Sequence, residues 1–222
     1  MKDTDPTVPH GLAPRKTPVQ TRSGATVEAI FEATIQVLLA DGATRLTTTR
    51  VTERAGVSVG TLYQYFPNKQ ALLFAMLERH FDEVVHRFEE LADTVERVCA
   101  DGPGQPIVQL AESLADAYVS VKVARPDRTM AMYQVAGAID RGNLAIGLYE
   151  RLKSATVRVL AHASDASFSN VGPVVFTLLS TVSGLVRATF ENPAAGSEGV
   201  ARLRDEAALV ARAYLTAAAD RT

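Results

Sequence analysis

The amino-acid sequence predicts an all-α protein with two helical domains. Apolar residues recur three and four positions apart in one segment after another, as the buried stripe of an amphipathic helix requires. Clusters of Gly, Pro and Asn separate these segments, and no stretch alternates apolar and polar residues like a half-buried strand. A chain of 222 residues can hold one large domain or two small ones, and we expect an N-terminal domain of three helices followed by a C-terminal helical domain.

Residues 1–19 precede the first helical pattern, and their composition does not favour folding. Residues 1–20 contain four prolines and no apolar run. The segment therefore predicts a disordered tail without the apolar core of a signal peptide, and we expect a cytoplasmic protein. Arg15, Lys16 and Arg22 allow a second interpretation, in which the tail reaches DNA as basic arms do elsewhere.

The first helix is predicted over residues 24–40. Its apolar stripe has helical spacing, and Asp41-Gly42 ends it because glycine readily takes the conformation that follows a helix. The stripe consists of Val27, Ile30, Phe31, Thr34, Ile35, Leu38 and Leu39.

Residues 47–66 predict two short helices joined by a tight turn. Thr47 is placed to cap the first helix and Ser58 the second, where the Ser58 hydroxyl accepts a hydrogen bond from the amide of Thr61. Gly56 lies in the turn, at a position that requires a positive φ. The predicted buried residues are Val51 and Ala55 in the first helix and Leu62 and Phe66 in the second.

The outward face of this motif carries hydroxyls and small side chains. Hydroxyl and ammonium groups suit phosphate contacts, while small residues let a helix approach base edges closely. We expect base readout in the major groove from Ser58, Val59, Gly60 and Thr61. The expected phosphate contacts are Thr47, Thr48, Tyr63, Tyr65 and Lys69, with Arg50 as an additional contact.

Residues 22–73 resemble the DNA-binding domain of the TetR (tetracycline repressor) family of transcriptional regulators. The pattern is matched at Gly42, Thr47-Thr48, Ala55-Gly56-Val57-Ser58, Gly60-Thr61-Leu62-Tyr63, Tyr65-Phe66, Lys69 and Leu72. The sequence departs from it at Ala43, where an aromatic residue is common, and at Thr52, where alanine is usual and where we expect the hydroxyl to bond a neighbouring carbonyl. The resemblance implies a helix-turn-helix domain at residues 20–80 and a ligand-binding and dimerisation domain at residues 81–222.

The rest of the chain is also predicted to be helical. A long helix follows Pro67-Asn68 and links the two domains, with an apolar stripe from Leu72 to Val95. The Gly- and Pro-containing residues 101–106 form the clearest break after the motif. Further helices are predicted near residues 106–124, 126–136, 143–163, 171–190 and 198–219.

Residues 166–186 carry no charge, which predicts a helix covered on all sides. We reject a membrane span because the apolar part is short and contains several hydroxyl residues. A second subunit is the favoured cover, in a four-helix interface, and a deep monomeric core is the alternative. The predicted interface residues are Leu179, Val182, Leu203, Ala207, Val210 and Tyr214.

The C-terminal helices also carry aromatic residues and methionines that suit an apolar ligand cavity, although an ordinary core is the alternative. The candidate lining residues are Tyr118, Met130, Met132, Tyr133, Gln134, Phe176, Leu179 and Ser183. The resemblance implies a homodimeric repressor, and we expect an unidentified small apolar effector to release it from a palindromic operator in double-stranded DNA. Arg187 suits an ion pair across the interface better than a contact to an anionic ligand.

Signatures of catalysis and of metal binding are missing from the sequence. Cys99 is the only cysteine, which excludes a disulfide framework and a Cys-based zinc site. His80, Glu83 and His86 lack the spacing of a metal-binding helix, so we interpret them as solvated side chains. We expect no catalytic residue, metal or cofactor. A helical enzyme with a helix-turn-helix-like segment and an architectural DNA-binding protein without an effector are the alternative functions.

The charge distribution supports a DNA-binding N-terminal domain more than the net charge of −2 does. Residues 10–80 contain eight Lys or Arg and five Asp or Glu, whereas residues 81–222 contain fourteen and eighteen. A basic N-terminal part and an acidic C-terminal part suit a DNA-binding domain followed by a separate regulatory domain. So small a difference also fits a chance distribution of charges.

Overall fold

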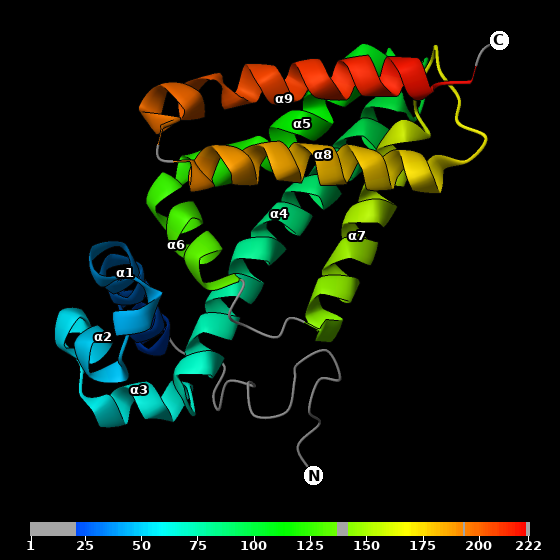
Figure 1. Cartoon of the computed structure of the whole chain (residues 1–222). Helices are drawn as coiled ribbons and strands as arrows, with labels where there is room; N and C mark the ends of the chain where they lie inside the picture. Colours follow the sequence, from blue (N-terminus) through cyan, green and yellow to red (C-terminus); the bar gives the residue numbers. More distant parts are fainter. Residues whose placement is uncertain (1–20, 137–141, 193, 221–222) are drawn as a thin grey trace. The chain divides into compact units, whose positions relative to one another are not determined.

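A computed structural model describes residues 21–136, 142–192 and 194–220 and confirms the all-α prediction (Figure 1). No strand occurs in these ranges, and one isolated bridge pairs Gln105 with Ala163. The predicted disordered tail, with Arg15 and Lys16, lies outside the described residues. The elements are α1 (Thr21–Asp41), η1 (Ala43–Arg45), α2 (Thr48–Ala55), α3 (Val59–Tyr65), α4 (Lys69–Cys99), α5 (Ile107–Ala124), α6 (Pro126–Ala136), α7 (Gly142–Leu160), α8 (Val171–Glu191) and α9 (Gly196–Ala218).

The contacts divide the chain into two compact units. Among the described residues, the N-terminal unit comprises residues 21–81, 127–136 and 142–147, and the C-terminal unit comprises residues 82–126, 148–192 and 194–220. The long helix α4 therefore contributes its first part to one unit and its remainder to the other.

The N-terminal unit packs α1, α2 and α3 around a small apolar core. Ile30 and Leu38 of α1, Leu62 of α3 and Leu72 of α4 are each fully buried. The rings of Phe31 and Phe66 lie 5.7 Å apart between centroids, within the range of favourable aromatic pairs. These contacts fix α2 and α3 on the surface of α1, so that the remaining faces of the motif point outward.

The C-terminal unit is built around α5, α8 and α9, which lie side by side in Figure 1. Leu203, Ala207, Ala211 and Leu215 form the buried stripe of α9, four residues apart. They join a core that includes Phe88 of α4 together with residues of α5 and α8. Each of these helices therefore buries one face within the single chain.

This packing corrects the predicted dimer interface. Leu179, Val182, Leu203 and Ala207 have exposed fractions of 8%, 3%, 2% and 0%, so they are core residues of the single chain. Val210 and Tyr214 are half-buried. The prediction erred because the helical stripe that it identified marks a buried face and does not say which helix covers that face.

A backbone clasp joins the segment before α5 to the segment after α7. The amide of Gln105 donates to the carbonyl of His162, and the amide of Ser164 donates to the carbonyl of Gln105, both at 2.9 Å. The amide of Ile107 donates to Asp165 Oδ1 at 2.7 Å. A Cβ on Gly104 would lie 2.2 Å from the His162 carbonyl oxygen, so only glycine fits this approach.

Two helices have the length and composition of a membrane span, over Ser23–Asp41 and Val171–Glu191. Long apolar core helices meet the same criteria. In α1 the apolar residues Ile30, Ile35 and Leu38 are buried in the N-terminal unit. In α8 the residues Val175, Leu178, Leu179, Val182 and Val186 are buried in the C-terminal unit.

Candidate nucleic-acid interface

The turn between α2 and α3 is formed by local hydrogen bonds that the sequence predicts. The amide of Arg50 donates to Thr47 Oγ1 at 3.3 Å, which caps α2. Gly56 ends α2 with φ 67°, in the left-handed region that favours glycine. The amide of Thr61 donates to Ser58 Oγ at 3.0 Å, which caps α3. Both predicted caps and the predicted turn glycine are therefore confirmed.

The buried side of the motif differs from the prediction at one residue. Val51 and Leu62 are buried as expected, but Ala55 is only half-buried and Thr52 takes its place with an exposed fraction of 2%. The Thr52 hydroxyl donates to the carbonyl of Thr49 at 2.9 Å, as the sequence analysis expects. This bond explains why a threonine is tolerated where a smaller apolar residue is usual.

The outward face of α3 carries the residues predicted for base readout. Ser58, Val59 and Gly60 are exposed and Thr61 is half-buried. Val59 retains an exposed fraction of 38%, large for an apolar residue on so short a helix. Since the two hydroxyls of Ser58 and Thr61 lie 2.8 Å apart, the start of α3 presents small polar groups within one turn of helix.

The predicted phosphate contacts surround this face, and several of them also contact one another. Thr48 Oγ1 and Tyr63 Oη lie 3.3 Å apart, which brings a hydroxyl of α2 next to one of α3. Lys69 Nζ donates to the carbonyl of Leu46 at 3.2 Å and so also supports the segment before α2. Arg50 forms an ion pair with Asp41 at 2.6 Å, for which a DNA phosphate would have to compete. Thr47 is exposed and Tyr65 is half-buried.

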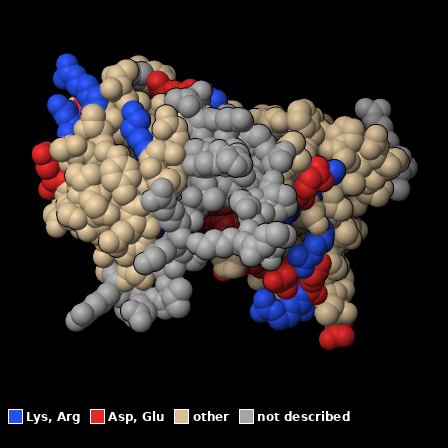
Figure 2. Space-filling view, turned by 90° about the horizontal axis from the view of Figure 1, so that it is seen from below, with Lys and Arg blue, Asp and Glu red and all other residues tan. Residues whose placement is uncertain are grey.

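Figure 2 shows how the charges are distributed on one face of the molecule. At the left of the view the surface is largely uncharged, with a few basic side chains near its upper edge and acidic side chains at its left and upper edges. At the lower right, basic and acidic side chains stand close together. A largely uncharged surface suits close approach to another molecule, whereas interleaved charges suit ion pairing within the protein.

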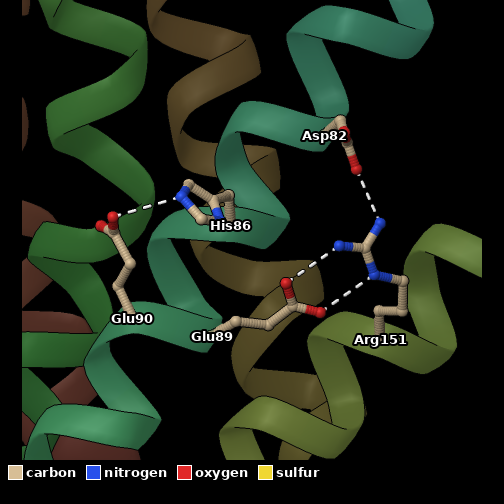
Figure 3. Close-up of polar contacts among 5 residues, drawn as sticks. All are labelled: Asp82, His86, Glu89, Glu90 and Arg151. Carbon is tan, nitrogen blue, oxygen red and sulfur yellow. Dashed lines mark hydrogen bonds and ion pairs between the residues drawn. The ribbon is translucent and has the colours of Figure 1, made fainter.

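Two arginines of α7 form ion pairs with carboxylates of α4. Arg151 donates from Nε and Nη2 to Glu89, both at 2.9 Å, and from Nη1 to Asp82 at 2.6 Å (Figure 3). One heptad later, Arg158 donates to both oxygens of Glu96 and to Asp93. The hydrogen bonds from Arg158 lower the pKa of Glu96, and those to Glu89 raise the pKa of Arg151 above its ordinary value. Both arginines therefore stay charged and clamp α7 to α4.

The histidines on α4 have different environments. His86 is exposed and lies 3.3 Å from Glu90 on the same helix (Figure 3). His80 has an exposed fraction of 3%, which corrects its interpretation as a solvated side chain. No group of three or more His, Cys, Asp or Glu able to hold a metal ion occurs in the described part of the chain.

The predicted ligand-lining residues are distributed over several environments. Tyr118 and Leu179 line a cavity of about 10 Å³ in the C-terminal unit, whereas Met132 lines another of about 10 Å³ in the N-terminal unit. Met130, Gln134 and Phe176 are exposed, with Phe176 against the ring of Tyr149, and Tyr133 and Ser183 are half-buried. Arg187 forms an ion pair with Glu191 of its own helix at 2.9 Å, and both side chains are exposed.

Sequence reasoning missed one residue that the structure makes prominent. Lys122, on α5, has an exposed fraction of 1%. A signal for it exists, because Lys122 follows the buried residues Tyr118 and Val119 at helical spacing. For Arg151 and Arg158 no such signal exists, since their spacing does not reveal which helix supplies the carboxylates.

Two family models match the chain: the first match ends within α4, and the second begins after it. The model described as "Bacterial regulatory proteins, tetR family" matches residues 30–76. The model described as "Tetracyclin repressor-like, C-terminal domain" matches residues 106–215. The chain belongs to the TetR family of bacterial transcriptional regulators. This confirms the resemblance that the motif at residues 47–66 suggests.

Curated relatives match about a quarter of the length of this TetR-family chain. The HTH-type transcriptional repressor KstR of Mycolicibacterium smegmatis is 42% identical over 55 residues, which are 25% of this chain and 27% of that protein. The Fatty acid metabolism regulator protein of Bacillus subtilis is 30% identical over 61 residues, 28% of this chain and 31% of that protein. The chain thus spans less than a third of the length of either relative.

Solved structures share the fold over nearly the whole chain. A putative TetR-family regulator from Mesorhizobium loti superposes with a TM-score of 0.66 at 14% identity, covering 89% of this chain and 98% of that one. SmeT, the repressor of the Stenotrophomonas maltophilia multidrug efflux pump SmeDEF, gives a TM-score of 0.64 at 18% identity, covering 89% and 92%. At these identities the likeness concerns the fold alone.

Proposed function

We propose that this regulator is a repressor that binds a palindromic DNA operator as a homodimer in the cytoplasm and releases it when a small molecule binds the C-terminal unit. The observation that carries the proposal is the outward face of α3. Ser58, Val59 and Gly60 are exposed at the capped start of α3, so they do not pack in the protein interior. Their small side chains suit close contact with base edges.

The surrounding hydroxyls support a phosphate-contacting role. Thr48 and Tyr63 come from different helices, yet their hydroxyl oxygens lie 3.3 Å apart. Two such donors can bind the oxygens of one phosphate and fix the register of α3 in the major groove. Lys69 adds a positive charge next to the motif and retains N–H groups besides the one that bonds Leu46.

Dimerisation is proposed because one helix-turn-helix reads only a half-site. The outer face of α8 remains uncovered in the single chain and is uncharged over Phe176, Thr177, Ser180, Thr181, Gly184 and Ala188. α9 adds the exposed residues Leu209, Ala213 and Ala217. We propose these residues, in place of the buried ones predicted from the sequence, as the surface that a second copy covers.

The switch is proposed to act through α4. This helix begins at Lys69, next to the DNA-contacting motif, and continues to Cys99 in the C-terminal unit. Paired reading helices must lie about 34 Å apart to enter successive major grooves. A ligand that shifts α4 in the C-terminal unit therefore changes operator affinity. To release the operator, the ligand need only bind the form with the wrong spacing of reading helices more tightly, by a few kcal/mol.

The DNA-binding proposal is tested by selecting duplexes from a randomised pool and titrating the enriched sequence. We expect a palindrome whose half-sites lie about one helical turn apart. Tyr63→Phe should weaken binding to the selected duplex and to random duplexes alike, because the lost hydroxyl contacts phosphate. A pool in which no sequence is enriched would instead indicate an architectural DNA-binding protein.

The dimer proposal is tested with a glycine on the outer face of α8. A Cβ at Gly184 would meet no atom within 4 Å in the single chain and the position is exposed, so Gly184→Glu should fold. In a dimer packed on this face it places a charge in the interface, and light scattering should find monomers that bind the operator weakly. Gly102→Glu is the matched control and should remain dimeric, because Gly102 is exposed and a Cβ there also meets no atom within 4 Å. A Gly184→Glu protein that stays dimeric would place the interface elsewhere.

A further inference from the structure

Gln64 lies at the centre of the outward face of α3. Successive residues of an α-helix are rotated by about 100° around its axis, so Gly60 and Gln64 each lie about 160° from Leu62, one on either side of the outward direction. Leu62 has an exposed fraction of 0%, whereas Gly60 and Gln64 are both exposed. These two residues are therefore the part of α3 that lies opposite its buried anchor.

The glycine leaves room for the side chain of Gln64. A long side chain on a helix leans toward the N-terminus and covers the turn before its own Cα. Gln64 can therefore extend over Gly60, one turn earlier, which has no side chain of its own. A Cβ built on Gly60 would lie 3.6 Å from Ser58 Oγ, an ordinary contact at the edge of this turn. The amide group of Gln64 is thus free to reach the surface on which Gly60 approaches DNA.

The chemistry of Gln64 suits a base better than a phosphate. Its side-chain amide carries an acceptor oxygen and a donor NH₂ group, whereas a phosphate oxygen only accepts and would leave the acceptor without a partner. In the major groove adenine presents the N7 acceptor beside the N6 amino donor, and a glutamine amide can bind both at once. α3 contains no charged residue that would draw it to the phosphate backbone instead.

The flanks of α3 provide the contacts that hold Gln64 in register. Tyr63 is displaced by about 100° from the centre of the helix's neighbour Leu62, which places it at the side of the outward face. Its hydroxyl lies 3.3 Å from the hydroxyl of Thr48 in α2. Phosphates border the groove on both sides and base edges form its floor, so side positions suit phosphates and the central position suits a base.

We propose that Gln64 is a specificity-determining residue that binds one adenine in each half-site of the operator. The side-chain oxygen accepts a hydrogen bond from adenine N6, and the side-chain nitrogen donates one to adenine N7. Gly60 permits the close approach that brings both atoms into reach. The inference rests on the proposed sequence-specific DNA binding and names a base pair that the outward face of α3 recognises.

The test compares the full-length wild type with Gln64→Met, which nearly conserves the shape of the side chain but removes its amide. Both proteins select duplexes from a randomised pool. Gln64→Met should enrich the same palindrome as the wild type, with the preference for A·T lost at one position of each half-site. Because methionine is a good helix former and the position is exposed, the melting temperature should not change.

Fluorescence anisotropy on two duplexes measures this preference. The first is the sequence that the wild type selects, and the second carries G·C in place of A·T at the position in question. The wild type should bind the first about tenfold more tightly, the scale of one bidentate base contact. The two affinities of Gln64→Met should differ by less than about threefold. Gln70→Met, which removes an exposed glutamine of α4, is the matched control and should keep the wild-type preference.

A modified duplex tests the contact to adenine N7 directly. 7-Deazaadenine lacks the N7 acceptor but retains the N6 amino group and pairing with thymine. Placed at the A·T position, it should lower the affinity of the wild type by about fivefold, as the loss of one hydrogen bond predicts, and leave that of Gln64→Met within about twofold.

A Gln64→Met protein that keeps the wild-type preference at every position would overturn the inference. So would an equal loss of affinity on all duplexes, which indicates a phosphate contact. If Gln64→Met does not fold, 7-deazaadenine placed at each adenine of the half-site in turn decides with the wild type alone, and no response at any of them refutes the contact. A pool in which no sequence is enriched would refute sequence-specific binding as well, whereas an enriched palindrome that Gln64→Met selects unchanged would refute the inference alone.

Discussion

Helices α3 and α9 are stabilised in different ways, and the difference assigns them different roles. α3 has seven residues, buries only Leu62, and is held at its start by the Ser58 cap. α9 has 23 residues and no side-chain cap, and buries Leu203, Ala207, Ala211 and Leu215. A helix held by its cap and one anchor can expose most of its surface to DNA. A helix held by a buried stripe must give up one face to the core and retains only the opposite face for a partner.

The energies of the two arrangements differ accordingly. An N-cap contributes about 1 kcal/mol, whereas each fully buried leucine contributes about 1.5–3 kcal/mol relative to an exposed one. The fold of the C-terminal unit should therefore respond strongly to changes in the α9 stripe, while changes around α3 should affect DNA binding more than folding.

The largest effect is expected in the α9 stripe. Leu203→Ala removes a side chain that is 2% exposed, and the free energy of unfolding should fall by about 2–5 kcal/mol. Leu209→Ala, on the same helix but 53% exposed, should change it by less than about 0.5 kcal/mol. Urea denaturation of the two variants measures the difference. Similar values for both would show that the stripe is not the core of this unit.

A second effect is expected at the backbone clasp. Gly104→Ala places a methyl group 2.2 Å from the carbonyl oxygen of His162, so the clasp must open and the free energy of unfolding should fall by about 1–3 kcal/mol. Gly102→Ala, which meets no atom within 4 Å, is the control two residues away and should be nearly neutral. Thermal melts of both proteins test this, and equal melting temperatures would contradict the close approach.

A smaller effect is expected at the cap of α3. Ser58→Ala leaves the Thr61 amide without its side-chain acceptor and should lower the free energy of unfolding by about 1 kcal/mol. Ser58→Asn retains a capping oxygen and should restore most of the loss. Hydrogen exchange at the amides of α3 measures the effect locally. Unchanged protection in Ser58→Ala would mean that packing alone holds the helix.

The smallest effect is expected in the pH dependence of stability. Hydrogen bonds from Arg158 lower the pKa of Glu96 from its ordinary value of 4.5, so the folded state favours the ionised carboxylate. The pair therefore stabilises the protein above that pH and loses its contribution as the pH falls through the lowered pKa. The difference in stability between wild type and Arg158→Met should be largest near neutral pH and should shrink as the solution is acidified below 4.5. A difference that is constant with pH would contradict this account. Arg158→Lys keeps the positive charge and should retain part of the pH-dependent stabilisation.

Local signals in the sequence predicted the motif, whereas the partners of the longer helices were not predictable. The roles of Thr47, Gly56 and Ser58 follow from backbone conformation and from hydrogen bonds within four residues, which a short stretch of sequence contains. The stripe of α9 was recognised through Leu203 and Ala207, but its placement at a subunit interface was wrong. Periodicity shows that a face is buried and leaves its covering element open.

The partners of the charged residues were not predictable for the same reason. The carboxylates that meet Arg151 and Arg158 lie more than 60 positions earlier in the chain, so no spacing rule connects them. Lys122 was detectable from its place on the buried face of α5, but a charged residue on such a face is easily read as a break in the pattern. The sequence thus predicts which face of each helix is buried, but it does not predict which other helix packs against that face.

The central claim, that the outward face of α3 reads base edges, is tested most directly by Gly60→Ala. The added methyl group would lie 3.6 Å from Ser58 Oγ, an ordinary contact, and alanine is the better helix former, so the protein should fold at least as well as the wild type. Fluorescence anisotropy on the selected operator and on a random duplex compares specific with non-specific binding. We predict that affinity for the operator falls by about tenfold or more, the scale of losing a base contact, while affinity for random DNA changes by less than about twofold. An equal loss on both duplexes, or no loss on either, would contradict the claim.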